Sequence, residues 1–302
     1  MTYEKILTGL LGKDERFIVL TAENRAVIRN LHQVAGKRLI DTGISEMTMI
    51  GMCAGLALKG RIPIAHALAT FLTMRAYEFI RTDIGIGCLP VKLIGGVPGI
   101  LSDGNGPTHQ ALEDVSLMRG IPNMKVFCPA DEDDLLKCIE KVLTSLSPYY
   151  IRYNGRKTDY SHASYFEEKK GEVISRGKDI NILTYGTLFK ESIEVMEMLE
   201  KRGFSMGLVN MRTLKPIDER IILDSLRCYS YTVTIEDHFI TGGLFSIVSE
   251  VAAKYFSNGK IIPIAFENKW FKPALLDDVL SYERLTPEDI TKRILKKIEN
   301  EK

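Results

Sequence analysis

Short apolar segments alternate with helical patterns along the first half of the chain, and this alternation constrains the fold more than any other feature. Strands are predicted at 17–20, 62–67, 91–96, 124–130 and 149–153. Helical patterns begin between them, near Ser45, Phe71, Gln110 and Asp131. Strands that alternate with helices build a mostly parallel sheet with helices on both faces. Such a sheet binds ligands at the carboxyl ends of its strands, so we expect functional side chains there.

A polar segment divides the chain into two parts. Residues 154–179 hold many charges and few aliphatic side chains, and the alternation resumes after them. Further strands are predicted at 180–186, 206–210, 231–237 and 260–266, with a helix over 187–203 and a charged helix after Thr286. We therefore predict two doubly wound α/β domains with mostly parallel sheets. They span residues 1–160 and 180–302 and are joined by a linker at 161–179.

Charge and composition argue against several classes of protein. The 40 basic and 39 acidic residues leave a net charge of +1, which gives no basic surface for nucleic acid or an anionic membrane. No apolar run has the length of a transmembrane helix. The cysteines are scattered and form no C-x-x-C pair, so we expect free buried thiols in a reducing compartment, the cytoplasm. They are Cys53, Cys88, Cys128, Cys138 and Cys228.

Glu46 stands at the head of an otherwise apolar helical pattern, residues 41–60. Ser45 is a candidate N-cap, which would place Glu46 in the first helical turn. The helix dipole alone favours an acidic residue there. Alternatively, neighbours such as Ile44 and Met47 shelter the carboxylate from water, which raises the pKa of a carboxylate and lets it hold or share a proton. A sheltered carboxyl group of this kind can hydrogen-bond the ring nitrogen of a heterocycle.

The segment 67–79 begins a helix with an aromatic residue at its mouth. Phe71 lies at the junction of strand and helix, where a ring can stack on a flat heterocycle, and a core position is the alternative. Met74 and Phe79 are expected in the core. Arg81 is expected to be a solvated charge.

A glycine-rich loop follows the strand at 91–96. Five glycines fall within residues 95–106, a pattern that suits close approach of the backbone to a ligand. His109 is predicted at the mouth of the helix after this loop. A lone histidine is more often structural, but one in this position is a candidate acid or base.

Several segments resemble the pyrimidine-binding domain of transketolases and of 1-deoxyxylulose-5-phosphate synthases. In collinear order over about residues 15–156 they read DTGISE, ATFLTMRAYEFIRTDI, DGNGPTHQALEDVSLMRGIPNM and CPADEDDLLKCIE. TYGTLFKESIEVMEMLEKRGF and IEDHFITGGLFSIVSE resemble the C-terminal domain that follows in this family. The resemblance covers nearly the whole chain. It implies a thiamine-diphosphate enzyme that transfers a two-carbon ketol unit between sugars.

The resemblance also implies roles for matching residues. The glutamate matching Glu46 hydrogen-bonds a ring nitrogen of the cofactor's aminopyrimidine and favours its imino tautomer, which takes the proton from the thiazolium carbon. Phe71 matches the ring that stacks on the pyrimidine, and Arg75 matches an arginine near the cofactor. His109 matches a histidine that contacts the substrate and is implied in proton transfer.

The candidate substrate contacts depart from the family pattern. Arg152 falls where the family places an arginine for the substrate phosphate, and Arg156 is the alternative. Asn105 replaces a family aspartate, with Asp103 two residues before it. The His-Asp-Ser stretch common in transketolases is missing after the strand, which here reads LIGGVPG. The donor and acceptor sugars therefore stay open, and a modified or nucleotide-linked sugar is compatible with these changes.

A partner subunit follows from the same resemblance. Full-length relatives hold the cofactor's diphosphate through magnesium in an earlier domain, marked by Gly-Asp-Gly and paired asparagines. This chain carries neither pattern in that context. We therefore expect the C-terminal half of a split transketolase, with no metal ligands of its own. Its N-terminal-type partner would hold Mg²⁺, and two copies of each chain would form a heterotetramer.

A second polar group follows a later strand. Glu236, Asp237 and His238 precede Gly242 and Gly243. We expect a structural and interface role, in which the glycines let the next helix pack closely. His238 is a minor candidate for lining the active-site cavity.

Other functions stay open. The β subunit of a 2-oxoacid dehydrogenase shares the fold and the glutamate, although GPTHQALEDVSLMRGIPNM is closer to transketolase. A deoxyxylulose-phosphate-synthase-like enzyme is a related alternative. A non-catalytic assembly module would keep the fold alone, but the retained Glu46, Phe71 and His109 argue against it. A nucleotide-binding domain is the weakest option, because no Gly-x-Gly-x-x-Gly follows a strand.

Overall fold

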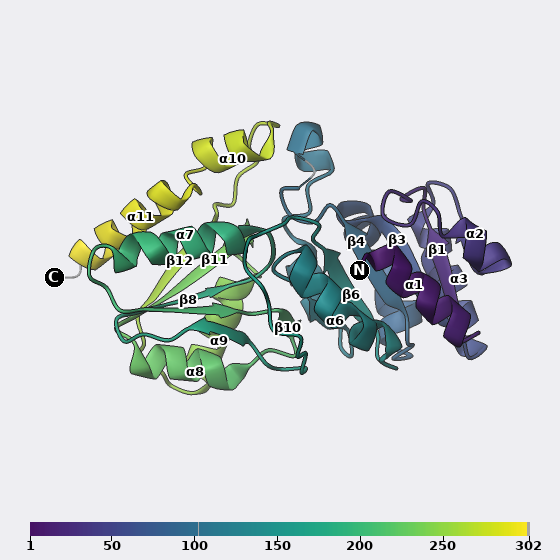
Figure 1. Ribbon diagram of the computed structural model, residues 1–302, viewed down its shortest axis with the longest axis horizontal. Coiled ribbons are helices and arrows are strands. Elements are labelled where there is room, and N and C mark those ends of the chain that lie inside the picture. The colour runs from purple at the N-terminus through teal and green to yellow at the C-terminus, as the bar shows by residue number, and fades with distance from the viewer. Residues whose placement is uncertain (102, 301–302) are drawn as a thin grey trace.

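The computed structural model describes residues 1–101 and 103–300, and the side chain of residue 103 also lies outside this description. Two sheets stand next to one another, each with helices on its faces (Figure 1). This arrangement confirms the predicted α/β class. No helix of the described residues combines the length and apolar character needed to cross a bilayer.

The first sheet has seven strands in the order β10-β5-β6-β4-β3-β1-β2, all parallel except β10. Its strands are β1 (Phe17–Thr21), β2 (Leu39–Asp41), β3 (Ile62–Leu68), β4 (Lys92–Gly96), β5 (Lys125–Phe127), β6 (Tyr149–Tyr153) and β10 (Thr213–Lys215). The α-helices of this region are α1 (Tyr3–Lys13), α2 (His32–Ala35), α3 (Glu46–Leu58), α4 (Tyr77–Phe79), α5 (Asp114–Gly120) and α6 (Glu132–Thr144). Irregular helical turns are η2 (Phe71–Arg75), η3 (Ile80–Gly85) and η4 (Asp103–Thr108).

The second sheet has five strands in the order β12-β11-β8-β9-β7, with only the edge strand β7 antiparallel. Its strands are β7 (Glu172–Ser175), β8 (Ile180–Thr184), β9 (Met206–Asn210), β11 (Tyr231–Phe239) and β12 (Ile261–Phe266). The helices are α7 (Phe189–Glu200), α8 (Glu219–Cys228), α9 (Leu244–Lys254), α10 (Leu276–Tyr282) and α11 (Pro287–Glu299).

Alternating side chains of the first sheet build two apolar layers. Val19 and Ile64 pack with α1, whereas their chain neighbours Leu20 and Ala65 pack with α3. Successive strand residues point to opposite faces, so a strand buried on both sides is apolar throughout. Because both faces are covered, ligands can reach this sheet only at its strand ends.

The two sheets are tied together by chain that returns from the second to the first. β10 pairs with β5, and the Lys215 ammonium donates hydrogen bonds to the carbonyls of Arg119 and Ile121. The predicted linker at 161–179 is not wholly irregular, because it supplies β7 as an edge strand of the second sheet. The strands β2, β7 and β10 are three or four residues long and were not predicted.

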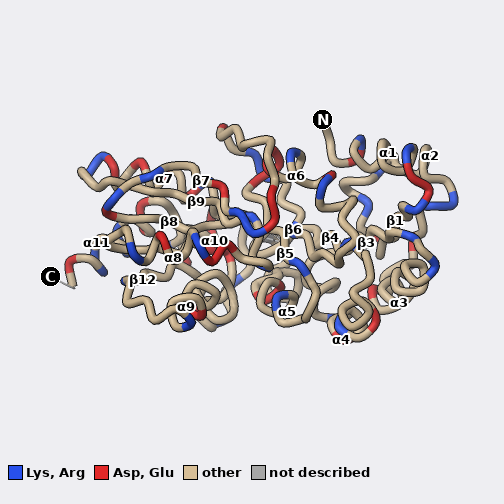
Figure 2. The backbone as a smooth tube through the Cα atoms, turned by 90° about the horizontal axis from the view of Figure 1, so that it is seen from below, with Lys and Arg blue, Asp and Glu red and all other residues tan. Residues whose placement is uncertain are grey.

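Charges and thiols are distributed over the surface and the core. Acidic and basic residues are interspersed over both halves of the described chain (Figure 2). All five cysteines are free, as expected, but Cys88 and Cys228 are exposed, so the prediction that every thiol is buried was wrong. Both lie outside the apolar layers, Cys88 in the turn after η3 and Cys228 at the end of α8.

Candidate active site

Glu46 is the first residue of α3, directly behind an edge strand. The chain leaves β2 at Asp41 and turns at Gly43, whose φ of 68° is a left-handed conformation that glycine adopts without strain. Ser45 occupies the N-cap position, which confirms the predicted start of α3, but its hydroxyl donates to the Thr42 carbonyl at 2.8 Å and makes no capping hydrogen bond. Glu46 is only 2% exposed, which confirms that its carboxylate is sheltered. The neighbours predicted to shelter it, Ile44 and Met47, are themselves 70% and 41% exposed, so that part of the prediction was wrong.

Arg75 pairs with Glu46 from a neighbouring π-helical turn, η2. Its Nη1 donates to Oε2 of Glu46 at 2.7 Å. Its guanidinium carbon also lies 4.3 Å from the centroid of the Phe71 ring, a cation–π contact. Among the described residues Oε1 of Glu46 has no hydrogen-bond partner, so half of the carboxylate is available to a ligand. Irregular π turns are frequent at functional sites.

His109 approaches the Phe71 ring from the glycine-rich loop. The two ring centroids are 5.0 Å apart and the planes cross at 70°. Thr108 Oγ1 lies 2.9 Å from Nδ1 of His109. Hydrogen bonds of 3.1 and 2.9 Å between the backbones of Gly99 and Ala111 close the loop at its base. His109 follows η4 and precedes α5, so it lies before the helix rather than at its mouth.

Two glycines seat this loop against the second domain. A Cβ on Gly99, which has φ +59°, would lie 1.8 Å from Oδ2 of Asp237. A Cβ on Gly106, at φ +69°, would lie 2.4 Å from Cγ of Pro273. Larger side chains at either position would push the loop away from the second domain. Figure 1 shows the loop standing beside α10, and these contacts set the position of His109.

Four predicted site residues therefore meet in one chain of contacts at the carboxyl ends of the first sheet: Glu46, Arg75, Phe71 and His109. Met74 and Phe79, which were expected in the core, are instead 36% and 40% exposed. The reason is that η2 and α4 turn one apolar side outward while Leu72 and Ala76 fill the core.

Arg152 does not have the accessibility that substrate binding requires. It is 1% exposed, and its guanidinium donates to Asp114 at 2.9 Å and to Asp237 at 2.7 Å. These two carboxylates come from different domains, and they keep the pKa of Arg152 well above its usual range despite burial. The structure thus contradicts the assignment of Arg152 to a substrate phosphate and gives it an interdomain ion-pair role.

Arg156, the alternative, lies beside a cavity of about 320 Å³ that Tyr153 and His66 also line. Both of its terminal nitrogens donate to Glu191, at 3.0 and 3.1 Å. Asn105 is exposed on η4. The side chain of Asp103, the other predicted substrate contact in this loop, lies outside the described part of the chain.

Two polar residues near the site were not predicted. His66 is buried on β3, where Nε2 lies 3.3 Å from the Tyr3 hydroxyl, and burial lowers its pKa to about 3. Gln110 is 2% exposed, and neither of its amide atoms has a hydrogen-bond partner among the described residues. The sequence offered a signal only for Gln110, which directly follows His109.

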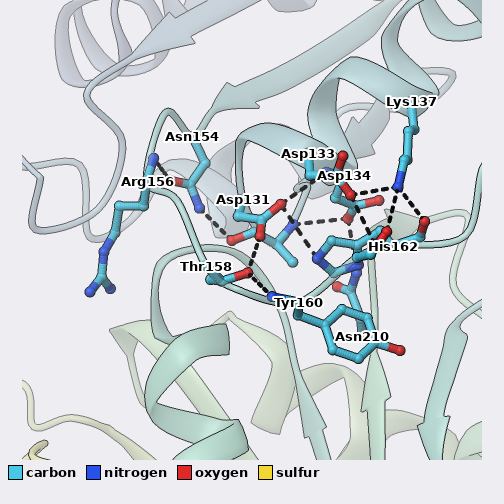
Figure 3. Close-up of polar contacts among 12 residues, drawn as sticks. Asp131, Asp133, Asp134, Lys137, Asn154, Arg156, Thr158, Tyr160, His162 and Asn210 are labelled. Atoms are coloured by element: carbon cyan, nitrogen blue, oxygen red, sulfur yellow. Dashed lines mark hydrogen bonds and ion pairs between the residues drawn. The ribbon is translucent and has the colours of Figure 1, made fainter.

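A buried polar cluster joins the domains near β9 (Figure 3). His162 contacts Asp131 at 3.4 Å and Glu172 at 2.7 Å. Burial alone would lower the pKa of His162, but these two carboxylates outweigh it and raise the pKa to about 9. Asp134, His162 and Glu172 have ligand atoms close enough for a metal ion. Arg212, however, already pairs with Asp134 and Glu172, so these two carboxylates have a cationic partner without a metal.

The group at the end of β11 has the structural role that we predicted. Glu236 accepts hydrogen bonds from the backbone N–H groups of Leu244 and Phe245, which caps α9. Burial raises the pKa of Glu236 to about 7. A Cβ on Gly243 would lie 2.0 Å from Oε2 of Glu236, so only glycine lets the helix start there. His238 accepts the Ser116 N–H at 3.3 Å and joins the two domains.

Comparison with known proteins identifies the family to which this chain belongs. The family described as transketolase, pyrimidine binding domain, matches residues 1–159, and the transketolase C-terminal domain matches residues 169–290. The chain belongs to the transketolase family. It corresponds to the C-terminal half of a transketolase, in agreement with the resemblance found in the sequence.

The sequence matches to individual relatives cover most or nearly all of this chain. A transketolase C-terminal section of Methanocaldococcus jannaschii is 34% identical over 305 residues, which are 99% of this chain and 96% of that protein. A 6-deoxy-6-sulfo-D-fructose transketolase subunit of Clostridium sp. strain MSTE9 is 34% identical over 254 residues, 82% of this chain and 79% of that one. A solved structure described as a split gene transketolase, inactive beta4 tetramer, has a TM-score of 0.88 at 32% identity. The match covers 97% of this chain and 96% of that chain.

Proposed function

We propose that this chain is the C-terminal subunit of a split, thiamine-diphosphate-dependent transketolase that moves a two-carbon ketol unit between sugars. The observation that carries the proposal is the buried carboxylate of Glu46, held at the head of α3 and paired with Arg75. Arg75 in turn contacts the Phe71 ring, which packs against His109. Because Glu46 is the first residue of a helix, the backbone of α3 fixes the position of this carboxylate at the end of the sheet where ligands bind.

The residues present fit the pyrimidine half of the cofactor. Oε1 of Glu46 can accept a hydrogen bond from a ring N–H, and the Phe71 ring offers an aromatic surface for stacking. Arg75 covers one face of Phe71, so its guanidinium has to leave that face if a heterocycle stacks there. When bound, thiamine diphosphate supplies the carbanion chemistry that breaks and forms carbon–carbon bonds.

His109 is the proposed acid–base group for the sugar. Its ring is partly exposed, unlike the buried His66 and His238, and Thr108 holds one of its nitrogens. Histidine is the side chain that most often serves as a general acid or base in enzymes. We assign it to hydroxyl groups of the donor or acceptor, while Arg75 balances the charge of Glu46.

Assembly completes the site in this proposal. Exposed apolar side chains gather on α3 and on the adjoining η2–η3 segment, and we call them the α3–η3 patch: Met47, Met52, Met74, Phe79 and Ile86. Apolar clusters of this kind mark association surfaces. We assign the patch to a second copy of this chain and Mg²⁺ to a partner subunit, in a cytoplasmic heterotetramer.

Reconstitution tests the proposal. The chain is purified alone and together with an N-terminal-type transketolase subunit, and ketol transfer is followed with thiamine diphosphate, Mg²⁺ and a panel of ketose donors. We expect transfer by the complex only, and a loss of at least about 100-fold in the Glu46→Ala complex. Absence of transfer from every donor, or full activity of the Glu46→Ala complex, would refute the proposal.

A further inference from the structure

The cavity beside Arg156 shares its strands with the candidate active site. β3 passes from His66, which lines the cavity, to Leu68 and on to Phe71. β4 is followed by Val97 and Leu101, which line the cavity, and the same loop then carries His109. The cavity therefore lies at the same strand ends as Glu46 and Phe71. Its volume of about 320 Å³ is in the range of small-molecule sites.

The side chains lining the cavity are mostly apolar. Val27, Ile94, Val97 and Leu101 supply aliphatic surface. His66 carries no charge near neutral pH, because burial holds its pKa at about 3. Asn24 and Tyr153 add an amide and a hydroxyl group, which hydrogen-bond sugar hydroxyls without charge.

Arg156 is the sole cationic residue among the described residues that line this cavity, and it already forms an ion pair with Glu191. Glu191 accepts both terminal nitrogens, at 3.0 and 3.1 Å, and the Thr187 carbonyl accepts a further hydrogen bond from Nη1. Glu191 itself is 5% exposed, so moving Arg156 to another anion would leave a buried carboxylate unpaired. A phosphate group in the cavity would consequently lack a counter-charge.

Backbone features keep the cavity open. A Cβ on Gly96 would lie 2.6 Å from Nδ2 of Asn24, so any larger residue would displace that amide. Val97 adopts a φ of +53°, an unusual conformation for a β-branched residue that costs conformational energy. Strain of this kind is retained where a site requires it, and here it turns an aliphatic side chain toward the cavity.

We propose that this cavity binds the uncharged end of the ketose substrate, so that the enzyme selects sugars without a terminal phosphate or sulfonate. The inference rests on the proposed ketol transfer and adds to it the chemical class of the substrate. Apolar lining residues favour a deoxy or otherwise apolar terminal carbon, and Asn24 and Tyr153 recognise neighbouring hydroxyl groups.

The test compares matched donors in the reconstituted complex: D-fructose with D-fructose 6-phosphate, and D-xylulose with D-xylulose 5-phosphate. We expect a higher kcat/KM for the unphosphorylated member of each pair. Glu191→Gln should release Arg156 and shift this ratio toward the phosphorylated donor by about tenfold or more, equivalent to about 1.4 kcal/mol. Val97→Arg should shift it in the same direction. Glu194→Gln on the same helix is the control, since its side chain is exposed, and it should leave the ratio unchanged.

Binding gives a second readout. Titration calorimetry of the same four sugars into the Glu46→Gln complex should show tighter binding of the unphosphorylated donors. A tenfold preference of the wild type for phosphorylated donors would overturn the inference while leaving ketol transfer intact. An unchanged ratio in both Glu191→Gln and Val97→Arg would overturn it as well. Failure of every donor in every variant would instead count against the proposed function.

Discussion

A buried carboxylate and a half-exposed guanidinium dominate the site at the scale of single residues. Glu46 is sheltered, whereas Arg75 is 39% exposed, so the pair is solvated from one side only. Water weakens the attraction between partly exposed charges, and Arg75 can therefore move when a ligand replaces it. The pairing holds the carboxylate in its orientation until then.

Removal of the guanidinium should have a modest cost to stability. In Arg75→Gln we expect a loss of about 1 kcal/mol, because solvent screening already limits the pair. The melting temperature should fall by about 2–4 °C. Arg81→Gln, an exposed arginine on the same irregular segment, serves as the control and should melt like the wild type. A fall of more than about 10 °C in the melting temperature of Arg75→Gln would contradict this expectation and show that solvent does not screen the ion pair.

The sequence predicted the site residues that depend on local pattern and family resemblance. Glu46, Phe71, Arg75 and His109 each follow a strand, and their meeting is a consequence of parallel topology. Arg152 was misassigned because its partners Asp114 and Asp237 lie far away in the chain. Burial by residues distant in sequence leaves no trace in a local motif, and the same is true of the Arg156 ion pair.

The glycine-rich loop is the element that brings the domains and the site together. Gly99 lies against Asp237, and the loop ends are bridged by backbone hydrogen bonds with Ala111. We expect Gly99→Ala to destabilise the protein by about 2–4 kcal/mol, because positive φ and a clash act together. Gly104→Ala in the same loop is the matched control, since its Cβ would meet open space.

Thermal unfolding of both variants checks this prediction, and ketol transfer by the complex reports on His109. Gly99→Ala should melt at least about 5 °C below the wild type and lose activity, whereas Gly104→Ala should change neither by much. Equal melting temperatures for the two variants would mean that the loop is not held by Asp237.

Elements inside a long apolar run were predicted, including the three-residue β5 within 124–130, whereas short strands outside such runs were not. The parallel strands β1, β3, β4, β6, β8, β9, β11 and β12 all match apolar runs. β2, β7 and β10 are too short to show alternation, and they are ordered by the sheets against which they pair. The outward turn of Met74 and Phe79 likewise reflects packing of η2 and α4 rather than local composition.

At the scale of the whole molecule, charge networks lock the two domains together, and His162 makes one of them sensitive to pH. Its pKa is about 9 in the folded protein against 6.5 unfolded, so protonation stabilises the fold. This stability is complete below pH 6.5 and is lost as the pH rises through 9. The shift corresponds to about 3 kcal/mol. The groups facing His162 are Asp131, Glu172 and, through them, Asp134 and Arg212.

Melting temperatures at pH 6.5 and pH 9.5 test this dependence. The wild type should lose more stability across the interval than His162→Gln, and the difference between the two proteins isolates His162 from other groups that titrate in this range. Parallel losses in the two proteins would contradict the raised pKa. If His162→Gln does not fold, an NMR titration of the imidazole in the wild type gives the same answer.

Self-association is the second property of the whole molecule that can be tested. We expect Phe79→Glu in the α3–η3 patch to shift the chain to smaller species in light scattering coupled to gel filtration, because a charge there opposes burial. Phe256→Glu is the control, since Phe256 is 92% exposed but lies after α9 in the second domain. An unchanged mass for Phe79→Glu, or an equal decrease in mass for Phe256→Glu, would contradict the assignment of the α3–η3 patch to the interface.

The most direct measurement of the central claim follows exchange of the thiazolium C2 proton of bound thiamine diphosphate with deuterium, by NMR, in the complex with the partner subunit. Proton transfer by a positioned group contributes about 10²–10⁴-fold, so Glu46→Gln should slow the exchange by that factor at unchanged cofactor occupancy. Glu78→Gln, an exposed glutamate on α4, should exchange like the wild type. Equal exchange rates in the wild-type and Glu46→Gln complexes, with cofactor fully bound in both, would contradict the assignment of Glu46 to the chemistry.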